Sequence, residues 1–467
     1  MVDVDVRRTF ATEVVSKLRK AGFQAFWAGG CVRDIVLGDA PADYDVATNA
    51  VPSQVTGLFR RTVAVGESFG VVRVIGPEGA GDVEVATFRS DGRYVDGRHP
   101  ESVTFGTAEM DAARRDFTIN GMFLDPLTGA LIDYVGGQAD LAQRILRAIG
   151  DPEARFNEDK LRLLRAVRFA ARFRMQIDPR TRESLVRMSD QVRMVAAERI
   201  AQELKRMLVH PTRAKAMDLA FETGLVAAIL PDLVPMKDLF QGKPIQPEGN
   251  LWDHTLLVLD SLPPDPSFAL AFAALLHDVG KPRTKGLQDG KITFYNHEQV
   301  GARIAERICR ELKLSNAERE RIVWLVEYHQ YLGEAKKMRE SKLKRILAAE
   351  GIDELLALHR ADALASTGDT SQIDYCEQYL REQPAGPIDP PPLVTGHDLQ
   401  RIGLLPGPQF AILLEKIREL QLERVLNSKR EALDWLDRYL KPGTGDRIEP
   451  SAGSKQDTGG DCAEPSA

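Results

Sequence analysis

The stretch that decides the fold is Gly29-Gly30-Cys31-Val32-Arg33-Asp34, followed by Asp43-Tyr44-Asp45-Val46-Ala47-Thr48. The apolar residues 25–28 in front of the glycines predict a short strand, and the residues behind them predict a helix. Glycines at such a turn let backbone N–H groups approach an anion closely, and a helix N-terminus favours negative charge. Arg33 can add a charge-assisted contact to phosphate. The pattern predicts a phosphate-binding turn at Gly30 and Arg33.

The paired aspartates predict a metal site beside this turn. Asp43 and Asp45 are two residues apart in an extended stretch, so both side chains face the same way. Adjacent carboxylates repel each other, and Mg²⁺, which takes one or two carboxylates together with substrate phosphates, removes that cost. Glu84, on the strand expected at 83–88, is the best candidate for a third catalytic carboxylate, although Asp82 would share its face.

Length and composition indicate a multidomain protein without a membrane anchor. A chain of 467 residues with 43% hydrophobic residues can form about two to four ordinary cores. No apolar run is long enough to cross a bilayer, and the N-terminal residues lack the apolar segment of a signal peptide. Four widely spaced cysteines without a CxxC pair fit a reducing compartment, so we expect a cytoplasmic protein.

The order of helix and strand signals predicts an α+β fold. Residues 1–150 mix both signals and should form a small head around a mixed sheet. From about residue 151 strand signals are nearly absent, which predicts all-helical domains. We expect a helical neck at 151–215, a helical body at 216–382, a stiff proline-rich linker, a helical tail at 393–441 and a disordered end at 442–467.

Positive charge is concentrated in the middle of the chain. The formal net charge is −6, yet residues 141–210 hold 16 Arg and Lys against 9 Asp and Glu, so this stretch carries +7 and the rest about −13. A basic segment in an acidic chain is the electrostatic pattern of a protein that binds a polyanion such as RNA, although a solvated helix surface would show the same pattern.

Five motifs in one order resemble the class II tRNA nucleotidyltransferase and poly(A) polymerase family. The first is the glycine turn with its aspartate pair. The others are Arg114-Arg115-Asp116-Phe117-Thr118-Ile119-Asn120, with Gly121 where alanine is usual, the stretch 140–150, the stretch 158–169, and Ala197-Glu198-Arg199-Ile200 with Glu203-Leu204. The resemblance covers roughly residues 20–210. It implies a two-metal nucleotidyltransferase head, and it adds Arg115 and Asn120 to the triphosphate site.

The fourth motif suggests how a base would be selected. Asp159, Arg162, Arg165 and Arg168 are three residues apart, so on a helix they would form one row. Asp159 can accept a hydrogen bond from the exocyclic amine of C or A, while Arg162 can donate one to the ring nitrogen. U and G present the opposite pattern and would leave buried groups unpaired. Arg165 and Arg168 can reach sugar or phosphate.

The polar stretch 88–100 is similar to a flexible loop of family members that add the terminal A. Its presence argues against an enzyme restricted to adding C.

A second set of residues resembles the HD metal-dependent phosphohydrolase superfamily. The adjacent pair His277-Asp278 ends an apolar helix, and the remaining candidates lie on both sides of it in the order of that superfamily. Imidazole and carboxylate together suit Mn²⁺, Co²⁺, Ni²⁺ or Zn²⁺. An HD domain that folds but has lost its activity has the same pattern. The expected metal ligands are His254, His277, Asp278 and Asp362, with His297 and His329 extending the site to two metals.

The leading hypothesis is template-independent transfer of CMP and AMP from CTP and ATP to the 3′ end of tRNA, with Mg²⁺ as the metal. A poly(A) polymerase or an enzyme adding only the terminal A would have nearly the same motifs. A phosphohydrolase whose head merely binds RNA is the alternative of another class. We expect the partners to be the 3′ end of tRNA or another RNA, with no membrane and no obligatory protein partner.

Overall fold

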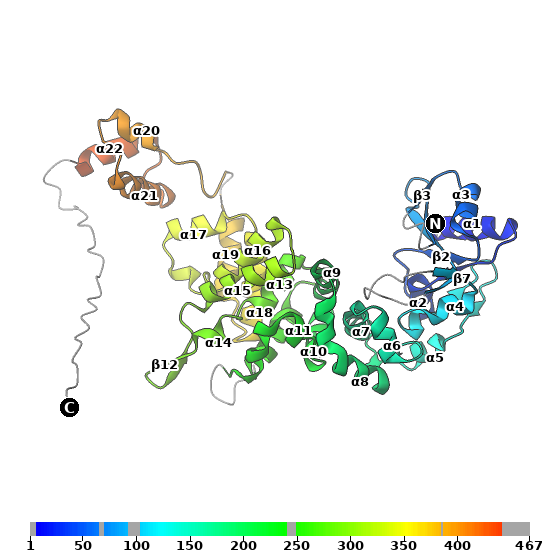
Figure 1. Ribbon diagram of the computed structural model, residues 1–467. Coiled ribbons are helices and arrows are strands. Elements are labelled where there is room, and N and C mark those ends of the chain that lie inside the picture. Colours follow the sequence, from blue (N-terminus) through cyan, green and yellow to red (C-terminus); the bar gives the residue numbers. More distant parts are fainter. Residues whose placement is uncertain (1–5, 65–69, 92–102, 241–248, 384–385, 441–467) are drawn as a thin grey trace, which may run out of the picture. The chain divides into compact units, whose positions relative to one another are not determined.

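The computed structural model describes residues 6–64, 70–91, 103–240, 249–383 and 386–440 (Figure 1). These residues divide into two compact units. The first comprises residues 1–333 and 353–373, and the second comprises residues 334–352 and 374–467. The disordered end expected at 442–467 and most of the loop expected at 88–100 lie outside the described residues. No described helix is long and apolar enough to cross a membrane.

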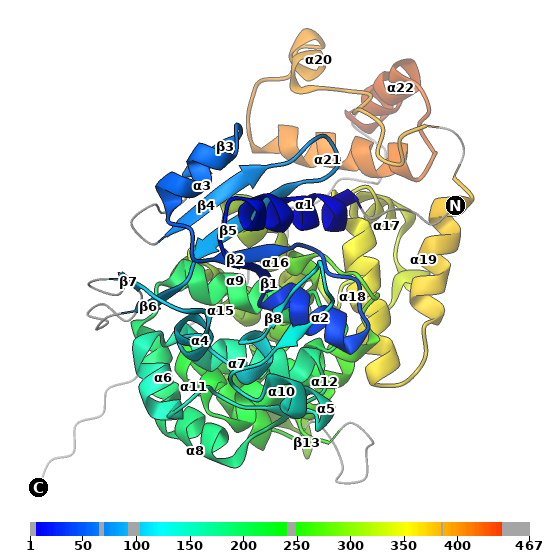
Figure 2. The ribbon, with the colours of Figure 1, turned by 90° about the vertical axis from the view of Figure 1, so that its right-hand side faces the viewer.

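The head of the first unit contains a mixed seven-stranded sheet in the order β3-β4-β5-β2-β1-β8-β9 (Figure 2). Strands β2 and β5 are parallel, and the other neighbouring pairs are antiparallel. The strands are β1 Ala25–Ala28, β2 Asp45–Thr48, β3 Thr62–Ala64, β4 Val71–Ile75, β5 Asp82–Thr87, β8 Phe123–Leu124 and β9 Leu131–Ile132.

Short helices cover this sheet and connect its strands. Helix α1 packs against β1 and β2 through Ala11, Val14, Val15 and Leu18, whose spacing of three to four residues puts them on one apolar face. A separate pair of strands, β6 and β7, follows β5. The remaining head elements are α1 Val6–Lys20, α2 Gly30–Leu37, α3 Pro52–Leu58, β6 Arg89–Asp91, β7 Val103–Phe105, α4 Ala108–Ala113, the 3₁₀ turn η2 Thr118–Asn120, α5 Gly137–Ala142 and β10 Ile145–Leu146.

The neck follows directly and is helical, as the sequence predicts, apart from one short strand. Strand β11 Gln176–Ile177 pairs in parallel with β10, so the expectation of no strand beyond residue 151 is wrong here. Two-residue strands carry no periodicity that a sequence could show. The elements of the expected neck are α6 Pro152–Glu158, α7 Leu161–Arg172, α8 Pro179–Met188, η3 Ser189–Met194 and α9 Ala197–Leu208. Helix α10 Arg213–Glu222 crosses the expected boundary at residue 215, and α11 Leu225–Ile229 and η4 Pro231–Asp238 lie in the expected body.

The body is built around the apolar helix α13, in which residues 269–276 are all buried. It also holds a hairpin, β12 Gly286–Gln288 and β13 Lys291–Thr293, which the helical expectation missed. Asp289 and Gly290 form its two-residue turn with positive φ values of 51° and 74°, and this Asp-Gly pair is a recognisable hairpin signal. The helices are α12 Leu251–Ser261, α13 Phe268–Leu276, α14 Lys281–Thr284, α15 His297–Glu311, α16 Asn316–Tyr328 and α18 Ile352–Ala365.

The second unit is helical and has its own small core. Val394, Leu399, Leu413 and Leu436 are among the residues buried in that core. Its elements are η5 Ala335–Lys337, α17 Glu340–Leu347, most of α19 Ser371–Arg381, α20 Gly396–Arg401, α21 Pro408–Leu422 and α22 Lys429–Leu440.

Candidate functional sites

The paired aspartates lie where β2 begins. Tyr44 is buried and its ring packs 4.7 Å from the ring of Trp27, so the chain turns its apolar side inward at this position. Asp43 and Asp45, on either side of Tyr44, are exposed and line a common cavity. In the parallel pairing of β2 with β5, Asp45 lies directly opposite Glu84. On the other side of β5, Glu84 pairs with Arg73 of β4 and Asp82 pairs with Ile75, and Asp82 lies outside the pairing of β5 with β2.

The three carboxylates crowd one another. Although part of Asp45 is open to solvent, nearby protein atoms desolvate its carboxylate, and this desolvation together with the negative charges of Asp43 and Glu84 raises the pKa of Asp45 to about 6. An isolated surface aspartate would not show this shift. A divalent cation with a preference for oxygen ligands would relieve the repulsion, so these residues fit Mg²⁺.

The glycine turn brings an arginine against the backbone. Gly29 has a φ of 73°, and a Cβ atom placed there would lie 2.8 Å from Nη1 of Arg115. Arg115 also donates to the carbonyl oxygen of Asn120. Its Nε and Nη2 are held by Asp111, a fully buried carboxylate of α4 that also binds Arg114. Glycine at position 29 therefore leaves the space that this guanidinium occupies.

A chain of polar contacts links the head to the neck. Arg33 donates through Nη1 to the Asn120 side-chain oxygen at 2.7 Å. The Asn120 amide donates to Asp116 at 3.0 Å, and Asp116 accepts two hydrogen bonds from Arg165 of α7 at 2.6 and 2.8 Å. Burial alone would raise the pKa of Asp116, but Arg165 and Asn120 hold it well below its usual range.

The prediction that all four residues of the fourth motif lie on one helix is wrong for Asp159. Helix α6 ends at Glu158 and α7 begins at Leu161, so Asp159 lies between them, with an extended backbone. There its side chain accepts a hydrogen bond from the Leu161 amide, the kind of local bond by which aspartate starts a helix. Only Arg162, Arg165 and Arg168 share a helix.

Each residue of this motif has a protein partner. Arg199 of α9 binds both oxygens of Asp159, Glu158 binds Arg162, and Glu203 of α9 binds Arg168. These pairs fix the side chains before any ligand is present.

A cavity of about 850 Å³ joins these groups. Among the residues expected at the site, Glu84 alone is not part of its lining. The expected residues that line it are Gly30, Arg33, Asp43, Asp45, Arg115, Asn120, Asp159, Arg162, Arg165 and Arg168. The lining thus combines the paired aspartates and Arg33 and Arg115 of the head with Asp159 and the three expected arginines of α7 in the neck.

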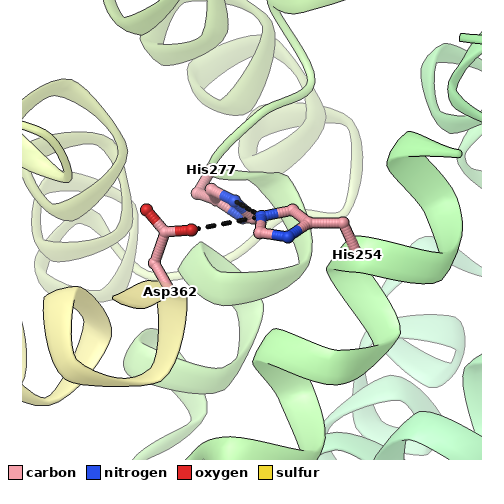
Figure 3. A group of neighbouring side chains, drawn as sticks. All are labelled: His254, His277 and Asp362. Carbon is pink, nitrogen blue, oxygen red and sulfur yellow. Dashed lines mark hydrogen bonds and ion pairs between the residues drawn. The ribbon is translucent and has the colours of Figure 1, made fainter. Parts of the chain in front are cut away.

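The histidines of the body form a second site from residues far apart in the chain. His254 lies on α12, His277 and Asp278 follow α13, and Asp362 lies on α18. Nε2 of His254 is 3.1 Å from a carboxylate oxygen of Asp362 and 3.4 Å from Nε2 of His277 (Figure 3). The ligand atoms of these three residues all lie within 4.8 Å of one another.

A second group of ligand atoms shares Asp278 with the first. One carboxylate oxygen of Asp278 lies 3.2 Å from Nε2 of His277. The other lies 3.4 Å from Nε2 of His297 and 3.5 Å from Nε2 of His329, and it accepts no hydrogen bond although it is buried. A buried carboxylate oxygen without a hydrogen bond between two imidazoles is the arrangement that a cation would satisfy.

Backbone carbonyl groups orient three of the imidazoles. Nδ1 of His277 is 2.8 Å from the Ala274 oxygen, and the equivalent bonds of His297 and His329 to backbone oxygens measure 2.8 and 2.7 Å. A proton on each Nδ1 leaves the Nε2 lone pairs facing the cluster, as metal ligands require. These imidazole nitrogens and carboxylate oxygens therefore fit a transition metal such as Mn²⁺, Co²⁺, Ni²⁺ or Zn²⁺.

Three family models match the chain. A poly(A) polymerase head domain matches residues 25–147, a probable RNA- and SrmB-binding site of polymerase A matches residues 174–236, and an HD domain matches residues 253–367. The chain therefore contains one region similar to a poly(A) polymerase head domain and another similar to an HD domain. The resemblance drawn from the five motifs is thereby confirmed.

Named CCA-adding enzymes are similar to about half of this chain. The CCA-adding enzyme of Anoxybacillus flavithermus is 41% identical over 229 residues, which are 49% of this chain and 57% of that protein. The CCA-adding enzyme of Geobacillus stearothermophilus is 40% identical over 48% of this chain and 54% of that protein. The chain thus spans little more than half the length of the curated relatives it matches.

Solved structures of the family are similar over a longer stretch. The Bacillus stearothermophilus CCA-adding enzyme in complex with CTP has a TM-score of 0.71 at 26% identity, covering 92% of this chain and 96% of that chain. The Thermotoga maritima CCA-adding enzyme complexed with tRNA has a TM-score of 0.59 at 18% identity, covering 93% and 95%. The α+β architecture of head and helical domains is confirmed.

Sequence reasoning missed several residues that hold the site together. Asp111 was given no role, although an acid three and four residues before two arginines is the spacing of helical ion pairs. Arg199 and Glu203 were quoted only as part of a motif. No local pattern indicates that they bind Asp159 and Arg168.

Proposed function

We propose that this protein transfers CMP and AMP from CTP and ATP to the 3′ end of tRNA, restoring a terminal C-C-A. The observation that carries the proposal is the cavity that Asp43, Asp45, Asp159 and Arg162 line together. The aspartates of the head suit a metal with its triphosphate, and Asp159 and Arg162 suit the edge of a base.

In the reaction the 3′-hydroxyl oxygen of the RNA forms a bond to the α-phosphorus of the nucleotide. The bond between that phosphorus and the oxygen bridging to the β-phosphate breaks, and pyrophosphate leaves. Bound Mg²⁺ supplies charge stabilisation on the phosphates and lowers the pKa of the hydroxyl. Asp43 and Asp45 would hold Mg²⁺, Glu84 would orient the hydroxyl or accept its proton, and Arg115 and Arg33 would lie toward the triphosphate.

Base selection would follow from the neck. Asp159 can accept from the exocyclic amine of C or A, and Arg162 can donate to the adjacent ring nitrogen. Because Arg199 and Glu158 already hold these two side chains, a U or G would meet mismatched groups that cannot rotate to suit it.

The decisive experiment presents the purified protein with tRNA ending before the C-C-A, with CTP, ATP, UTP and GTP singly and together, and sequences the 3′ ends. We expect two C and one A, in that order, and no U or G. Long runs of A would instead identify a poly(A) polymerase. Addition of A only to tRNA ending in C-C would identify an A-adding enzyme. No addition with Mg²⁺ present would disprove nucleotidyl transfer.

A second activity is favoured by Asp278, whose two carboxylate oxygens lie beside different groups of histidines. We propose that the HD site binds Mn²⁺, Co²⁺, Ni²⁺ or Zn²⁺ and hydrolyses a phosphate ester at an RNA end, such as a 2′,3′-cyclic phosphate or a 3′-phosphate. The metal would supply a bound water of lowered pKa. Removal of such phosphates gives the free 3′-hydroxyl that the head needs.

The test of the HD site assays the protein on RNA with cyclic phosphate ends and on simple phosphoesters, with each of the four metals and Mg²⁺ in turn. We expect hydrolysis with a transition metal, together with metal in the purified protein by elemental analysis. Absence of both would leave the domain as a scaffold.

A further inference from the structure

The guanidinium of Arg33 lies on two aromatic rings of the neck. Its Cζ atom is 4.3 Å from the ring centroid of Phe173 and 5.4 Å from that of Phe169. The two rings stack on each other, with centroids 6.0 Å apart and planes inclined by 21°. Phe169 belongs to α7 and Phe173 ends that helix, whereas Arg33 belongs to α2 of the head. One side chain of the head therefore rests on an aromatic pair of the neck.

The edges of the same guanidinium are occupied by groups of the head. Nε and Nη2 donate to Asp34 at 2.8 and 2.6 Å, and Nη1 donates to Asn120 at 2.7 Å. Arg33 is only 5% exposed. A guanidinium binds acceptors at its edge and aromatic rings at its weakly hydrated face, so it can join two domains at once. The hydrogen bonds fix Arg33 in the head, and the ring faces connect it to the neck.

Phe169 also contacts the arginines expected to meet the nucleotide. The Cζ atoms of Arg165 and Arg168 lie 5.1 and 4.2 Å from its ring centroid. On another side the ring meets Phe117 of the head edge-on, at 5.9 Å and 82°. Guanidinium groups from the head and from the neck thus surround the buried ring of Phe169. A change in the aromatic pair would therefore alter the positions of arginines in both domains.

We propose that Phe169 and Phe173 are positioning residues that hold Arg33 and thereby set the distance between the catalytic carboxylates and the base-selecting residues. A nucleotide bound in one conformation spans a defined distance from its α-phosphate to its base edge. It can reach Asp45 and Asp159 together only if head and neck keep one spacing, and a poorly fixed spacing weakens base selection. This inference rests on the nucleotidyl transfer proposed above, and it adds a specificity role for two residues outside the expected site.

The test replaces Phe173 with mono-, di- and trifluorophenylalanine by site-specific incorporation. Each fluorine withdraws charge from the ring face and weakens its attraction for a cation, while the ring keeps nearly the same shape. We expect the KM for CTP and the Kd for CTP from calorimetry to rise stepwise, to about two- to tenfold in the trifluoro protein. The preference for CTP over UTP should fall in parallel.

Two further sets of variants separate this role from simple packing. Phe173→Trp keeps an aromatic face and should retain near-parental values, whereas Phe173→Leu should behave like the trifluoro protein or worse. The same fluorine series at Phe221, whose ring packs 4.7 Å from Trp252 in the body, should leave CTP binding unchanged. A merely structural role would lower the melting temperature of both series alike, with no change in base preference.

The outcomes distinguish this inference from the proposed function. If the parent protein adds no nucleotide to tRNA, nucleotidyl transfer is disproved, and the Kd series for CTP still decides the role of the rings. If KM and Kd stay flat across the Phe173 series, or if Phe173→Leu keeps the parental CTP preference, the inference is overturned.

Discussion

Arg199 donates a hydrogen bond to each carboxylate oxygen of Asp159, from Nη2 at 2.8 Å and from Nη1 at 3.2 Å. The two residues are far apart in the chain, and Arg199 lies in the first turn of α9. Both residues are partly exposed and line the cavity, so the remaining acceptor capacity of Asp159 is accessible to a base bound there. Arg199 thus decides which way Asp159 points.

The first prediction concerns this pair. Asp159→Ala should lower the preference for CTP and ATP over UTP and GTP by about 10- to 100-fold, because the acceptor for the exocyclic amine is lost. Arg199→Ala should have a smaller effect in the same direction, since Asp159 remains but can rotate. Single-nucleotide incorporation on tRNA ending before the C-C-A measures both. Parental preference in Asp159→Ala would exclude Asp159 from base selection.

The second prediction concerns the carboxylates. Asp45→Asn should reduce nucleotide addition by about 1,000-fold or more, because a metal ligand is removed, while the fold is kept. Glu84→Gln should also impair addition strongly. Asp82→Asn is the matched control on the same strand, and we expect near-parental activity for it because Asp82 lies outside the pairing of β5 with β2. If Asp82→Asn were inactive and Glu84→Gln active, Asp82 and not Glu84 would be the third catalytic carboxylate.

The third prediction concerns acid stability. Because Arg165 and Asn120 hold the pKa of the buried Asp116 below its ordinary value of 3.8, its contribution to stability is complete at neutral pH. That contribution is lost as the pH falls below about 4.

Asp116→Asn should therefore lower the free energy of unfolding at pH 7 by about 1.5–3 kcal/mol, because the partly exposed Arg165 loses its charge-assisted hydrogen bonds to a buried carboxylate. It should also reduce the further loss of stability between pH 5 and pH 3. Denaturant unfolding across this range measures both. An unchanged pH profile would mean that Asp116 does not govern acid unfolding.

The fourth prediction concerns the HD site. His277→Ala and Asp278→Ala should abolish phosphoester hydrolysis and reduce bound transition metal, while nucleotide addition by the head continues. Removing the metal with a chelator and then adding back only Mg²⁺ should abolish hydrolysis while nucleotide addition recovers. Hydrolysis that survives in Asp278→Ala would assign the activity to another site.

The fifth prediction concerns RNA binding by the basic stretch 141–210. Affinity for tRNA should fall steeply with salt, with a slope of log affinity against log salt that grows by about 0.7 to 0.9 for each phosphate contact. Arg174→Gln should reduce the slope by about one contact, and Lys291→Gln, on the hairpin of the body, should not. A flat salt response would place RNA binding elsewhere.

Local sequence was sufficient for features that depend on backbone geometry. The alternation of a strand put Asp43 and Asp45 on one side and Tyr44 on the other, and the structure shows that arrangement. A three-residue spacing put Arg162, Arg165 and Arg168 on one helix. The extension of that rule to Asp159 was wrong, because a break between two helices at residues 159–160 has no signal as strong as proline or glycine.

Tertiary structure decided every pairing between distant segments. Whether Glu84 or Asp82 faces Asp45 depends on the register of β2 with β5, and a strand shows the same alternation in either register. The packing of helices determines that Arg199 binds Asp159. It also determines that one oxygen of Asp278 lies near His277 and the other near His297. The sequence by itself determined which residue types were available and which way neighbours point, because short-range periodicity is set by the backbone. Only the packed fold determined which of them meet, because contacts between distant segments depend on how the whole core packs.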